Sequence, residues 1–296
     1  MAGRRVVLLG GSGFVGRHLA PCLAGHGWTV RVALHRPGRP AARGVETVVA
    51  DLRSEDRVRA AVADAEVVVN LVGIGRERGQ SFEAVHVEGA ARVARLAAAG
   101  GATRLLHFSA LGVADDAPSA ADRTKAAGER AVRAAFPSAT VARPSLVYGP
   151  GDHFFTRFAA VARLSPAVPV IGGGRTLFQP LHVEDAARAL LALLDRPGTA
   201  GVTLALVGPE TFSFRELMER MLDALGRRRL IVSVPFPAAG ALATGLAWLP
   251  VPPLTREEVR LLRTDKVAGG LPTPAGLGVT ARPLWEGLPA CLYGAR

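Results

Sequence analysis

Glycines at three-residue spacing are the clearest chemical signal in this sequence. They follow an apolar run at residues 6–9 and precede a helical pattern. The segment consists of Gly10, Gly11, Ser12, Gly13, Phe14, Val15 and Gly16. Gly10 permits a tight turn, Gly13 a close backbone approach to a pyrophosphate, and Gly16 close helix packing, while the helix N-terminus offers unpaired N–H groups to the anion. We predict that this segment binds a dinucleotide.

The residues after the second apolar run indicate which dinucleotide is preferred. This run, at residues 29–34, ends in His35 and Arg36, and Arg39 follows. An Asp or Glu at this point would bind a ribose 2′-hydroxyl and repel a 2′-phosphate, whereas Arg36 can pair with the phosphate. We therefore expect NADP(H) to be preferred over NAD(H). The alternative is that Arg36 is a solvated loop arginine.

Two further strand ends are expected to contact the same cofactor. Asp51 and Leu52 close the third apolar run and are placed to meet the adenine ring. Asp51 can instead belong to the cap region of the next helix, for which Ser54 competes. Residues 70–75, at the end of the fourth run and just after it, are expected to line the far side of the dinucleotide; they include Leu71, Val72 and Gly73.

Lysine is rare in this chain. Lys125 and Lys266 are the only lysines among 36 Lys and Arg residues, so a functional lysine stands out. A solvated helix position is the alternative interpretation for Lys125.

Alternating strand and helix patterns must position these residues. Apolar runs predict strands at 6–9, 29–34, 47–50, 66–72, 104–108 and 140–142. Apolar residues at helical spacing predict helices at 14–24, 54–63, 82–99 and 123–136. This order predicts an α/β fold with a doubly wound parallel Rossmann sheet and a smaller C-terminal α+β lobe. We assign 1–150 plus about 177–210 to the dinucleotide domain, and 151–176 plus 211–296 to the lobe.

Composition excludes several classes of protein. The net charge of +11 invites a nucleic-acid interpretation, but the arginines are dispersed and no zinc or RNA-binding pattern occurs, so nucleic acid is an unlikely partner. Two distant cysteines offer neither a disulfide framework nor a metal motif. An apolar run begins near the N-terminus and leaves no room for a signal peptide. A cytoplasmic location is expected, with a peripheral position at a membrane surface as the open alternative.

An uncharged stretch at residues 230–254 is the second feature of note. Its prolines leave only 238–249 uninterrupted, which is too short to span a bilayer. The stretch is interpreted as a buried or pocket-lining helix, or as an apolar surface for a membrane interface or a protein partner. The sequence leaves the oligomeric state open.

Several motifs together resemble the extended and atypical short-chain dehydrogenases/reductases. They are 10–16 (GGSGFVG), 51–52 (DL), 121–129 (ADRTKAAGE), 143–150 (RPSLVYGP), 179–185 (QPLHVED) and 206–209 (LVGP). The last two, with 123–137, make the chain most similar to the NAD(P)H-binding accessory subunit family of respiratory complex I and its bacterial relatives.

The resemblance implies a Tyr-x-x-x-Lys pair in catalytic members. Lys125 matches the lysine, but Ala121 stands where the tyrosine belongs. Lys125 is then expected to bind the nicotinamide ribose, or to act in catalysis without a tyrosine partner. The resemblance also places Ser109, Pro144 and Ser145 near the nicotinamide.

Three functions follow as hypotheses. The first is an NADP(H)-binding protein with little or no turnover, because hydride transfer to a carbonyl needs a proton donor that Ala121 does not supply. The alternative is an NADPH-dependent oxidoreductase that uses Lys125 on a lipophilic substrate such as a quinone or isoprenoid. A weaker third hypothesis is nucleotide-sugar epimerisation or dehydration.

Overall fold

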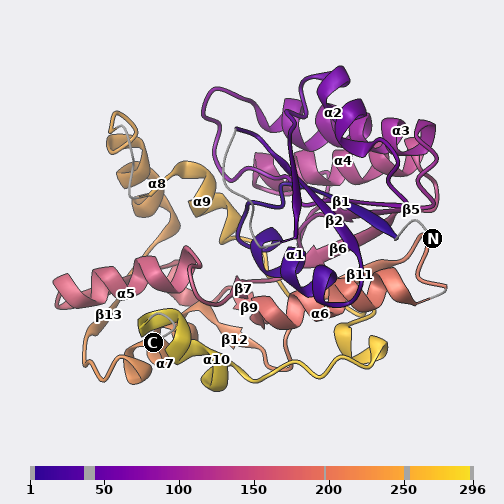
Figure 1. Ribbon diagram of the computed structural model, residues 1–296. Helices are drawn as coiled ribbons and strands as arrows, with labels where there is room; N and C mark the ends of the chain where they lie inside the picture. Colours follow the sequence, from indigo (N-terminus) through magenta and orange to yellow (C-terminus); the bar gives the residue numbers. More distant parts are fainter. Residues whose placement is uncertain (1–3, 37–43, 197, 250–253, 294–296) are drawn as a thin grey trace.

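A seven-stranded parallel sheet forms the centre of the molecule (Figure 1). A computed structural model describes residues 4–36, 44–196, 198–249 and 254–293. The strands are β1 (Arg5–Leu9), β2 (Thr29–Leu34), β3 (Glu46–Val49), β4 (Val67–Asn70), β5 (Arg104–Phe108), β6 (Thr140–Pro144) and β11 (Thr203–Leu206), in the order β11-β6-β5-β4-β1-β2-β3. The strands inside the sheet are mostly buried on both faces, as is typical of a sheet covered by helices on two sides, whereas the edge strand β3 is exposed or half-buried.

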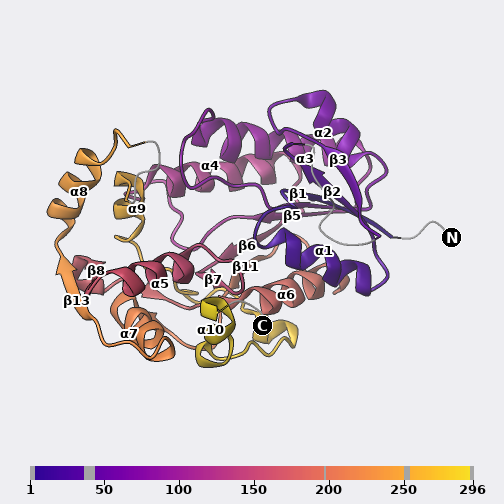
Figure 2. The same cartoon turned by 60° about the vertical axis from the view of Figure 1, so that its left-hand side comes forward.

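Helices cover the two faces of this sheet in separate layers (Figures 1 and 2). One face carries α1 (Gly16–Gly25) and α6 (Val183–Asp195), which pack against each other. The other face carries α2 (Glu55–Val62), the π-helix η1 (Glu83–Gly89), α3 (Ala90–Ala99) and α4 (Ala120–Ala135). The doubly wound sheet expected from the sequence is confirmed.

The strand order reverses between β1 and β4, which are neighbours in the sheet. In open α/β sheets, ligands bind in the crevice outside the carboxyl ends of the strands at such a point. The glycine-rich loop after β1 and residues 71–75 after β4 both lie there.

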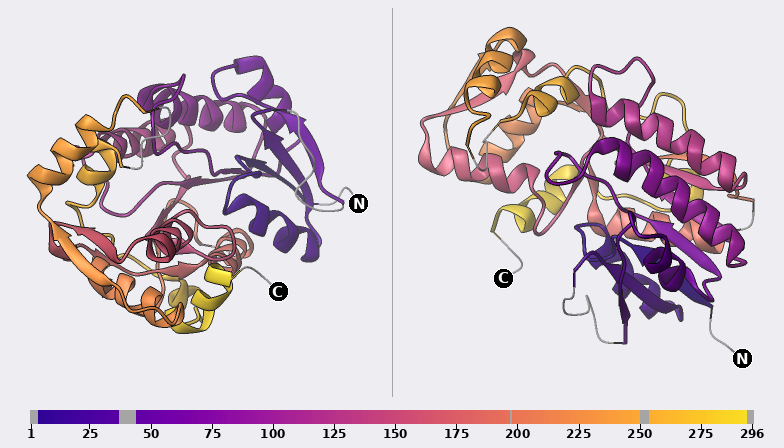
Figure 3. Two further views of the ribbon diagram at one scale, coloured as in Figure 1. Left: turned by 90° about the vertical axis from the view of Figure 1, so that its left-hand side faces the viewer. Right: turned by 90° about the horizontal axis from the view of Figure 1, so that it is seen from above.

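A second set of elements lies beyond the carboxyl ends of the strands (Figure 3). It contains α5 (Phe154–Leu164), β8 (Ala167–Ile171), α7 (Phe214–Ala224), β13 (Leu230–Val234), α8 (Phe236–Gly245), α9 (Arg256–Leu261) and α10 (Leu284–Tyr293). Its core is separate from the sheet and includes the buried aromatic rings of Phe155 and Phe214. The domain boundaries given above stay a prediction.

Short strand pairs and turns join the two parts. They are β7 (Val147–Tyr148) with β10 (Leu181–His182), β9 (Leu177–Phe178) with β12 (Phe212–Ser213), η2 (Gly172–Gly174) and η3 (Pro274–Leu277). These pairs place segments that are distant in sequence against the carboxyl end of β6.

The predicted and observed elements differ at three places. The helix expected at 82–99 begins as a π-helix, and residues 177–182, for which no element was predicted, hold two short strands. The uncharged stretch contains strand β13, which pairs in parallel with β8, followed by helix α8. Within the described ranges, no helix combines the length and apolar character needed to cross a bilayer.

Candidate functional site

The glycine-rich loop brings the N-terminus of α1 to the carboxyl edge of the sheet. The amide of Gly13 donates to the Gly10 carbonyl at 2.9 Å. A Cβ at Gly16 would lie 2.4 Å from the Gly11 Cα, so a side chain there would displace the loop. The close contact of Gly16 is thus with Gly11 of the loop, rather than with the strand as expected. No side chain caps the start of α1 at Val15, although the amides of Arg17 and His18 already donate to the Gly13 and Val15 carbonyls, and the positive end of the helix dipole favours an anion there.

The ends of β2 and β3 gather charged groups. His35 and Arg36 are exposed, and His35 Nδ1 lies 3.9 Å from Asp51 Oδ2. Arg53 pairs with the same carboxylate, Nη2 to Oδ2, at 2.7 Å. Hydrogen bonds from Arg53 lower the pKa of Asp51 to about 2. The sequence reasoning missed Arg53, for which the Asp-x-Arg spacing was the available signal.

Two predicted positions in this region need separate mention. Leu52 is buried in the core that α2 and α3 form with the sheet, and its contact with a cofactor stays a prediction. Arg39 lies outside the described residues.

Buried polar side chains hold the loop after β4. Asn70 Oδ1 accepts from the Val72 amide at 3.1 Å, and Asn70 Nδ2 lies 3.3 Å from His107 Nδ1. His86 Nε2 accepts from the Ile74 amide at 3.1 Å. The loop that carries Leu71, Val72 and Gly73 is therefore held from beneath by these three side chains.

His86 is a neutral member of this network. Burial, followed by the nearby charges of Lys125 and His107, lowers the pKa of His86 to about 3. Its Nδ1 lies 2.9 Å from Thr124 Oγ1, so the neutral ring donates there while Nε2 accepts. Sequence reasoning did not identify His86 or His107, because each lies in an apolar stretch that reads as core.

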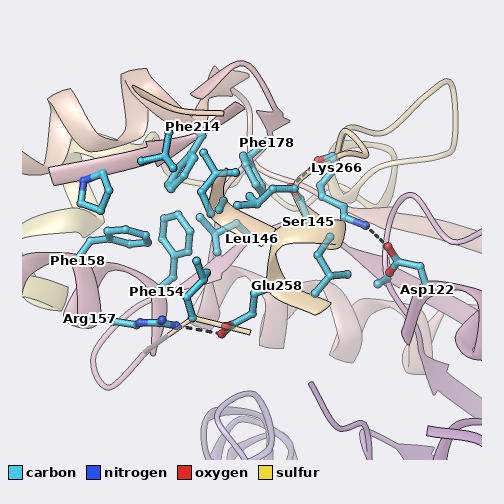
Figure 4. A pocket seen from close by; sticks show the side chains of 18 of the residues that line it. Asp122, Ser145, Leu146, Phe154, Arg157, Phe158, Phe178, Phe214, Glu258 and Lys266 are labelled. Atoms are coloured by element: carbon cyan, nitrogen blue, oxygen red, sulfur yellow. Dashed lines mark hydrogen bonds and ion pairs between the residues drawn. The ribbon is translucent and has the colours of Figure 1, made fainter. Parts of the chain in front are cut away.

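A large apolar cavity lies between the carboxyl ends of the strands and the second set of elements (Figure 4). Its volume of about 510 Å³ is in the range of small-molecule sites. Aromatic rings line one side, namely Phe154, Phe158, Phe178 and Phe214. The uncharged stretch contributes Val234, Ala239, Leu242, Leu246 and Leu254. This agrees with the interpretation of that stretch as pocket-lining.

The polar groups of the cavity are gathered at two places (Figure 4). At one, Lys266 Nζ forms an ion pair with Asp122 Oδ2 at 2.8 Å. At the other, Arg157 Nη1 lies 3.0 Å from Glu258 Oε1. Burial alone would raise the pKa of Glu258, but a hydrogen bond from Arg76 and the charge of Arg157 hold this pKa below its usual value.

Lys125 also lines the cavity, one helical turn after Asp122. Burial lowers the pKa of Lys125; Asp122 opposes this effect and the charge of Lys266 reinforces it. Among the described residues, no side chain or carbonyl forms a hydrogen bond or ion pair with the Lys125 ammonium. The cation is therefore positioned to meet a ligand.

Of the three residues that the resemblance places near the nicotinamide, two line the cavity and one does not. Pro144 and Ser145 line the cavity beside Lys125. The Ser145 hydroxyl donates to the Lys266 carbonyl at 2.6 Å and accepts from the Gln179 amide at 2.9 Å. Ser109 is buried and lies outside the cavity wall. The structure thus brings Lys125, Pro144 and Ser145 together, and their contact with a cofactor stays a prediction.

Ala121 is buried at the start of α4. Its amide and the Ser119 hydroxyl both donate to Glu257 Oε1 of α9 at 2.7 Å. The side chain at the position that the resemblance assigns to tyrosine is thus a methyl group with no ionisable atom.

The comparisons with known proteins agree with this geometry. The model of the NAD dependent epimerase/dehydratase family matches residues 6–205, which include the whole sheet apart from the ends of β1 and β11. The chain belongs to this family. Members are NAD(P)-dependent, and the glycine-rich loop of the present member follows β1 in the expected place.

Two relatives of the chain have names that describe different functions. The chain is 36% identical to NADH dehydrogenase [ubiquinone] 1 alpha subcomplex subunit 9, mitochondrial, of Arabidopsis thaliana over 82% of its own length, but it spans only 63% of that relative. It is 34% identical to the ceramide reductase of Caulobacter vibrioides over 92% of its own length and 90% of the relative. The similarity to a complex I subunit expected from the motifs is therefore confirmed.

Solved structures of family members share the fold. MoeE5 in complex with UDP-glucuronic acid and NAD aligns with a TM-score of 0.71 at 22% identity, over 97% of each chain. The dTDP-glucose 4,6-dehydratase DesIV of Streptomyces venezuelae aligns with a TM-score of 0.72 at 19% identity, over 97% of this chain and 95% of that one. At these identities, the likeness concerns the fold alone.

Proposed function

We propose that this protein is an NADP(H)-dependent reductase of a long-chain lipid ketone. The observation that carries the proposal is an apolar cavity whose polar end, formed by Asp122, Lys125 and Lys266, adjoins the carboxyl edge of a dinucleotide-type sheet. An apolar cavity with a few convergent polar groups is the usual form of a small-molecule site. A hydride acceptor bound there would place its tail among aromatic rings and its carbonyl near two ammonium groups.

The residues at the carboxyl ends of β1 and β2 fit a dinucleotide. Gly16 leaves no room for a side chain against Gly11, and the start of α1 is uncapped, so the loop and helix form a cradle for a pyrophosphate. Arg36 is exposed at the end of β2, where it would pair with a 2′-phosphate and favour NADP(H). Lys125 would bind the ribose or the reacting end. When bound, the reduced dinucleotide supplies the hydride.

The lipid class is suggested by the relative that the chain matches almost from end to end. The ceramide reductase of Caulobacter vibrioides shares 34% identity over 90% of its length, which includes the segments that line the cavity here. A reductase that forms a ceramide hydroxyl must act on the corresponding ketone. We therefore assign a keto-ceramide as the substrate class, in place of the quinone or isoprenoid first considered.

The proposal is tested by turnover of a keto-ceramide in detergent micelles with the wild-type protein. We expect NADPH absorbance to fall in step with ceramide formation measured by mass spectrometry, and NADH to be a poorer donor. Val161→Trp narrows the cavity and should raise KM by about tenfold, the effect of about 1.4 kcal/mol of lost binding.

The matched control is Leu164→Trp, since Leu164 lies on the same helix α5 but is exposed and outside the cavity wall. This variant should keep the wild-type KM. A protein that binds NADPH yet reduces no keto-ceramide would contradict the proposed function.

That outcome would favour the second candidate, an NADP(H)-binding protein with little turnover. The methyl side chain of Ala121 and the 36% identity to a complex I subunit are the observations in its favour. Such a protein should retain bound nucleotide through purification and should release it only on unfolding.

A further inference from the structure

Both lysines of the chain line the same cavity. Lys125 lies on α4 and Lys266 lies in the segment after α9, yet the fold brings both side chains to one polar end of the pocket. All other Lys or Arg positions of the 36 are arginine. Arginine cannot release a proton at physiological pH, whereas lysine can. The use of lysine at these two positions alone indicates a site that needs a transferable proton.

The backbone around Lys266 is held on both sides. Its amide donates to the Leu177 carbonyl at 2.7 Å, and its carbonyl accepts from the Ser145 hydroxyl at 2.6 Å. Two residues later, the Ala268 amide donates to Gln179 Oε1 at 2.6 Å. These contacts attach an irregular segment to the strand pairs beside the cavity and give Lys266 a defined position.

The Lys266 side chain passes over Gly112. This glycine has a φ of +75°, and a Cβ there would lie 2.9 Å from Lys266 Nζ. Glycine thus provides both the left-handed turn and the space for the ammonium group. The ammonium donates to Asp122 Oδ2 at 2.8 Å and to the Leu111 carbonyl at 2.9 Å. Since an ammonium carries three N–H groups, one donor is left for a ligand in the cavity that Lys266 lines.

The other polar groups of the cavity are unsuited to donate a proton. Arg157 is a permanent cation, and its partner Glu258 is held ionised. The Ser145 hydroxyl already donates its single proton to the Lys266 carbonyl. Ala121 has no ionisable atom. Of the side chains that line the wall, the two ammonium groups are therefore the available acids.

Resting on the proposed reductase function, we propose that Lys266 is the proton donor of this site and that Asp122 positions it. The substrate ketone oxygen accepts a hydrogen bond from the Lys266 ammonium. As the carbonyl carbon takes a hydride from the reduced nicotinamide dinucleotide, the C=O π bond breaks and the oxygen takes the ammonium proton. A C–H bond and an O–H bond form, the dinucleotide is oxidised, and the neutral Lys266 amine regains a proton from water.

Kinetics of two Lys266 variants test the proton step. Lys266→Arg keeps the charge and a partner for Asp122 but cannot release a proton, and Lys266→Met removes both. We expect each to lower kcat for keto-ceramide by about a hundredfold or more, the usual effect of losing a general acid. Their Kd for NADPH should stay within about twofold of wild type, whereas Lys125→Met should raise that Kd by about tenfold.

Arg130→Met is the matched control, because Arg130 lies on the same helix α4 in an exposed ion pair with Asp115. It should leave kcat and the NADPH Kd unchanged. Lys266→Arg with a kcat within about threefold of wild type would overturn the assignment of Lys266 while leaving the proposed function standing. A wild-type protein that binds NADPH and reduces no keto-ceramide removes the proposed function instead.

A second measurement needs no substrate. Incorporation of [ε-13C]lysine gives two resonances, since the chain has only two lysines, and Lys125→Arg and Lys266→Arg assign them. The groups near Lys125 are Asp122 on its own helix, Lys266, and the histidines His86 and His107. We expect the Lys125 resonance to titrate below the usual lysine range, since burial and Lys266 lower its pKa.

The two partners should move this pKa in opposite directions. Lys266→Met removes a positive neighbour and should raise the pKa of Lys125, whereas Asp122→Asn removes a negative one and should lower it. These shifts in opposite directions would support a coupled acid site. A Lys125 pKa that neither variant changes would contradict the placement of Lys266 beside it and overturn the proposal.

Discussion

At the scale of single residues, basic groups surround one carboxylate at the carboxyl ends of β2 and β3. Hydrogen bonds from Arg53 lower the pKa of Asp51 to about 2, which keeps this carboxylate ionised even in mildly acidic solution. Arg53 offsets that negative charge, so Asp51 no longer repels an anion as an isolated carboxylate would. The exposed Arg36 then adds a cation at the end of β2. This arrangement supports the proposed preference for a nucleotide that carries a 2′-phosphate.

Arg36→Ala should remove the preference for NADP(H). The variant loses a charge-assisted hydrogen bond of about 1.5–3 kcal/mol, so the Kd for NADPH should rise by about 10- to 100-fold. The Kd for NADH should stay within about twofold of wild type. Titration calorimetry measures both, with the exposed α2 arginine variant Arg57→Ala as the control. Equal losses for the two nucleotides would show that Arg36 does not read the 2′-phosphate.

At the scale of elements, helix α9 determines how α4 begins. Thr255 and Glu258 form a capping box at the N-terminus of α9. Glu257 then accepts hydrogen bonds from Ser119 and from the Ala121 amide at the N-terminus of α4, where a negative charge is favourable. The next residue, Glu258, binds Arg76 from the loop after β4. One turn of α9 thus connects the cavity wall to the turn that carries Asp122.

Glu257→Ala should leave the Ser119 hydroxyl and the Ala121 amide without their partner. We expect the free energy of unfolding in urea to fall by about 1–3 kcal/mol, the cost of unsatisfied buried polar groups. The KM for keto-ceramide should rise as well, because the first turn of α4 positions Asp122 and Lys125. Glu219→Ala, an exposed carboxylate on α7, is the control. A loss no greater than that of the control would show that α9 does not stabilise α4.

At the scale of the whole molecule, the cavity opens near an apolar surface. Helix α8 has no charged residue; Leu242 lines the cavity, and Trp248 after the helix is 79% exposed. Arg227 and Arg228 are exposed just before strand β13. Figure 3 shows α8 at the end of the molecule away from the sheet. An apolar helix followed by an exposed tryptophan is typical of proteins that bind a membrane surface, where a lipid substrate resides.

Trp248→Ser should weaken binding to vesicles that contain phosphatidylglycerol. Because the indole would be buried in the interface, we expect about a tenfold loss of partitioning in a sedimentation assay. Higher salt should weaken binding further by screening the arginines. Trp285→Ser on α10 is the matched control, since Trp285 is also exposed but lies on another element. Equal losses in the two variants would contradict docking through α8.

The sheet and its glycine-rich loop were predictable from the sequence. Both depend on local patterns: short apolar runs buried on two faces, and glycines at the turn after β1. Of the two interpretations that the sequence left open for 230–254, the pocket-lining one agrees with the cavity wall. The local patterns did not reveal strand β13, because its residues are exposed or half-buried with no regular alternation and its pairing partner β8 is distant in sequence. The π-helix η1 was also missed, since it has the apolar composition of an ordinary helix.

The sequence by itself determined which residues are candidates for chemistry: a glycine-rich loop after the first strand, a basic strand end, and two lysines in a chain of arginines. Only the tertiary structure decided that Lys125, Lys266 and Asp122 line one cavity, that Lys266 pairs with Asp122, and that His86 and Asn70 hold the loop after β4. The physical reason is the separation in sequence over which each interaction acts. Glycine turns and apolar periodicity act between neighbours in sequence, whereas an ion pair between α4 and a segment after α9 exists only once the chain has packed.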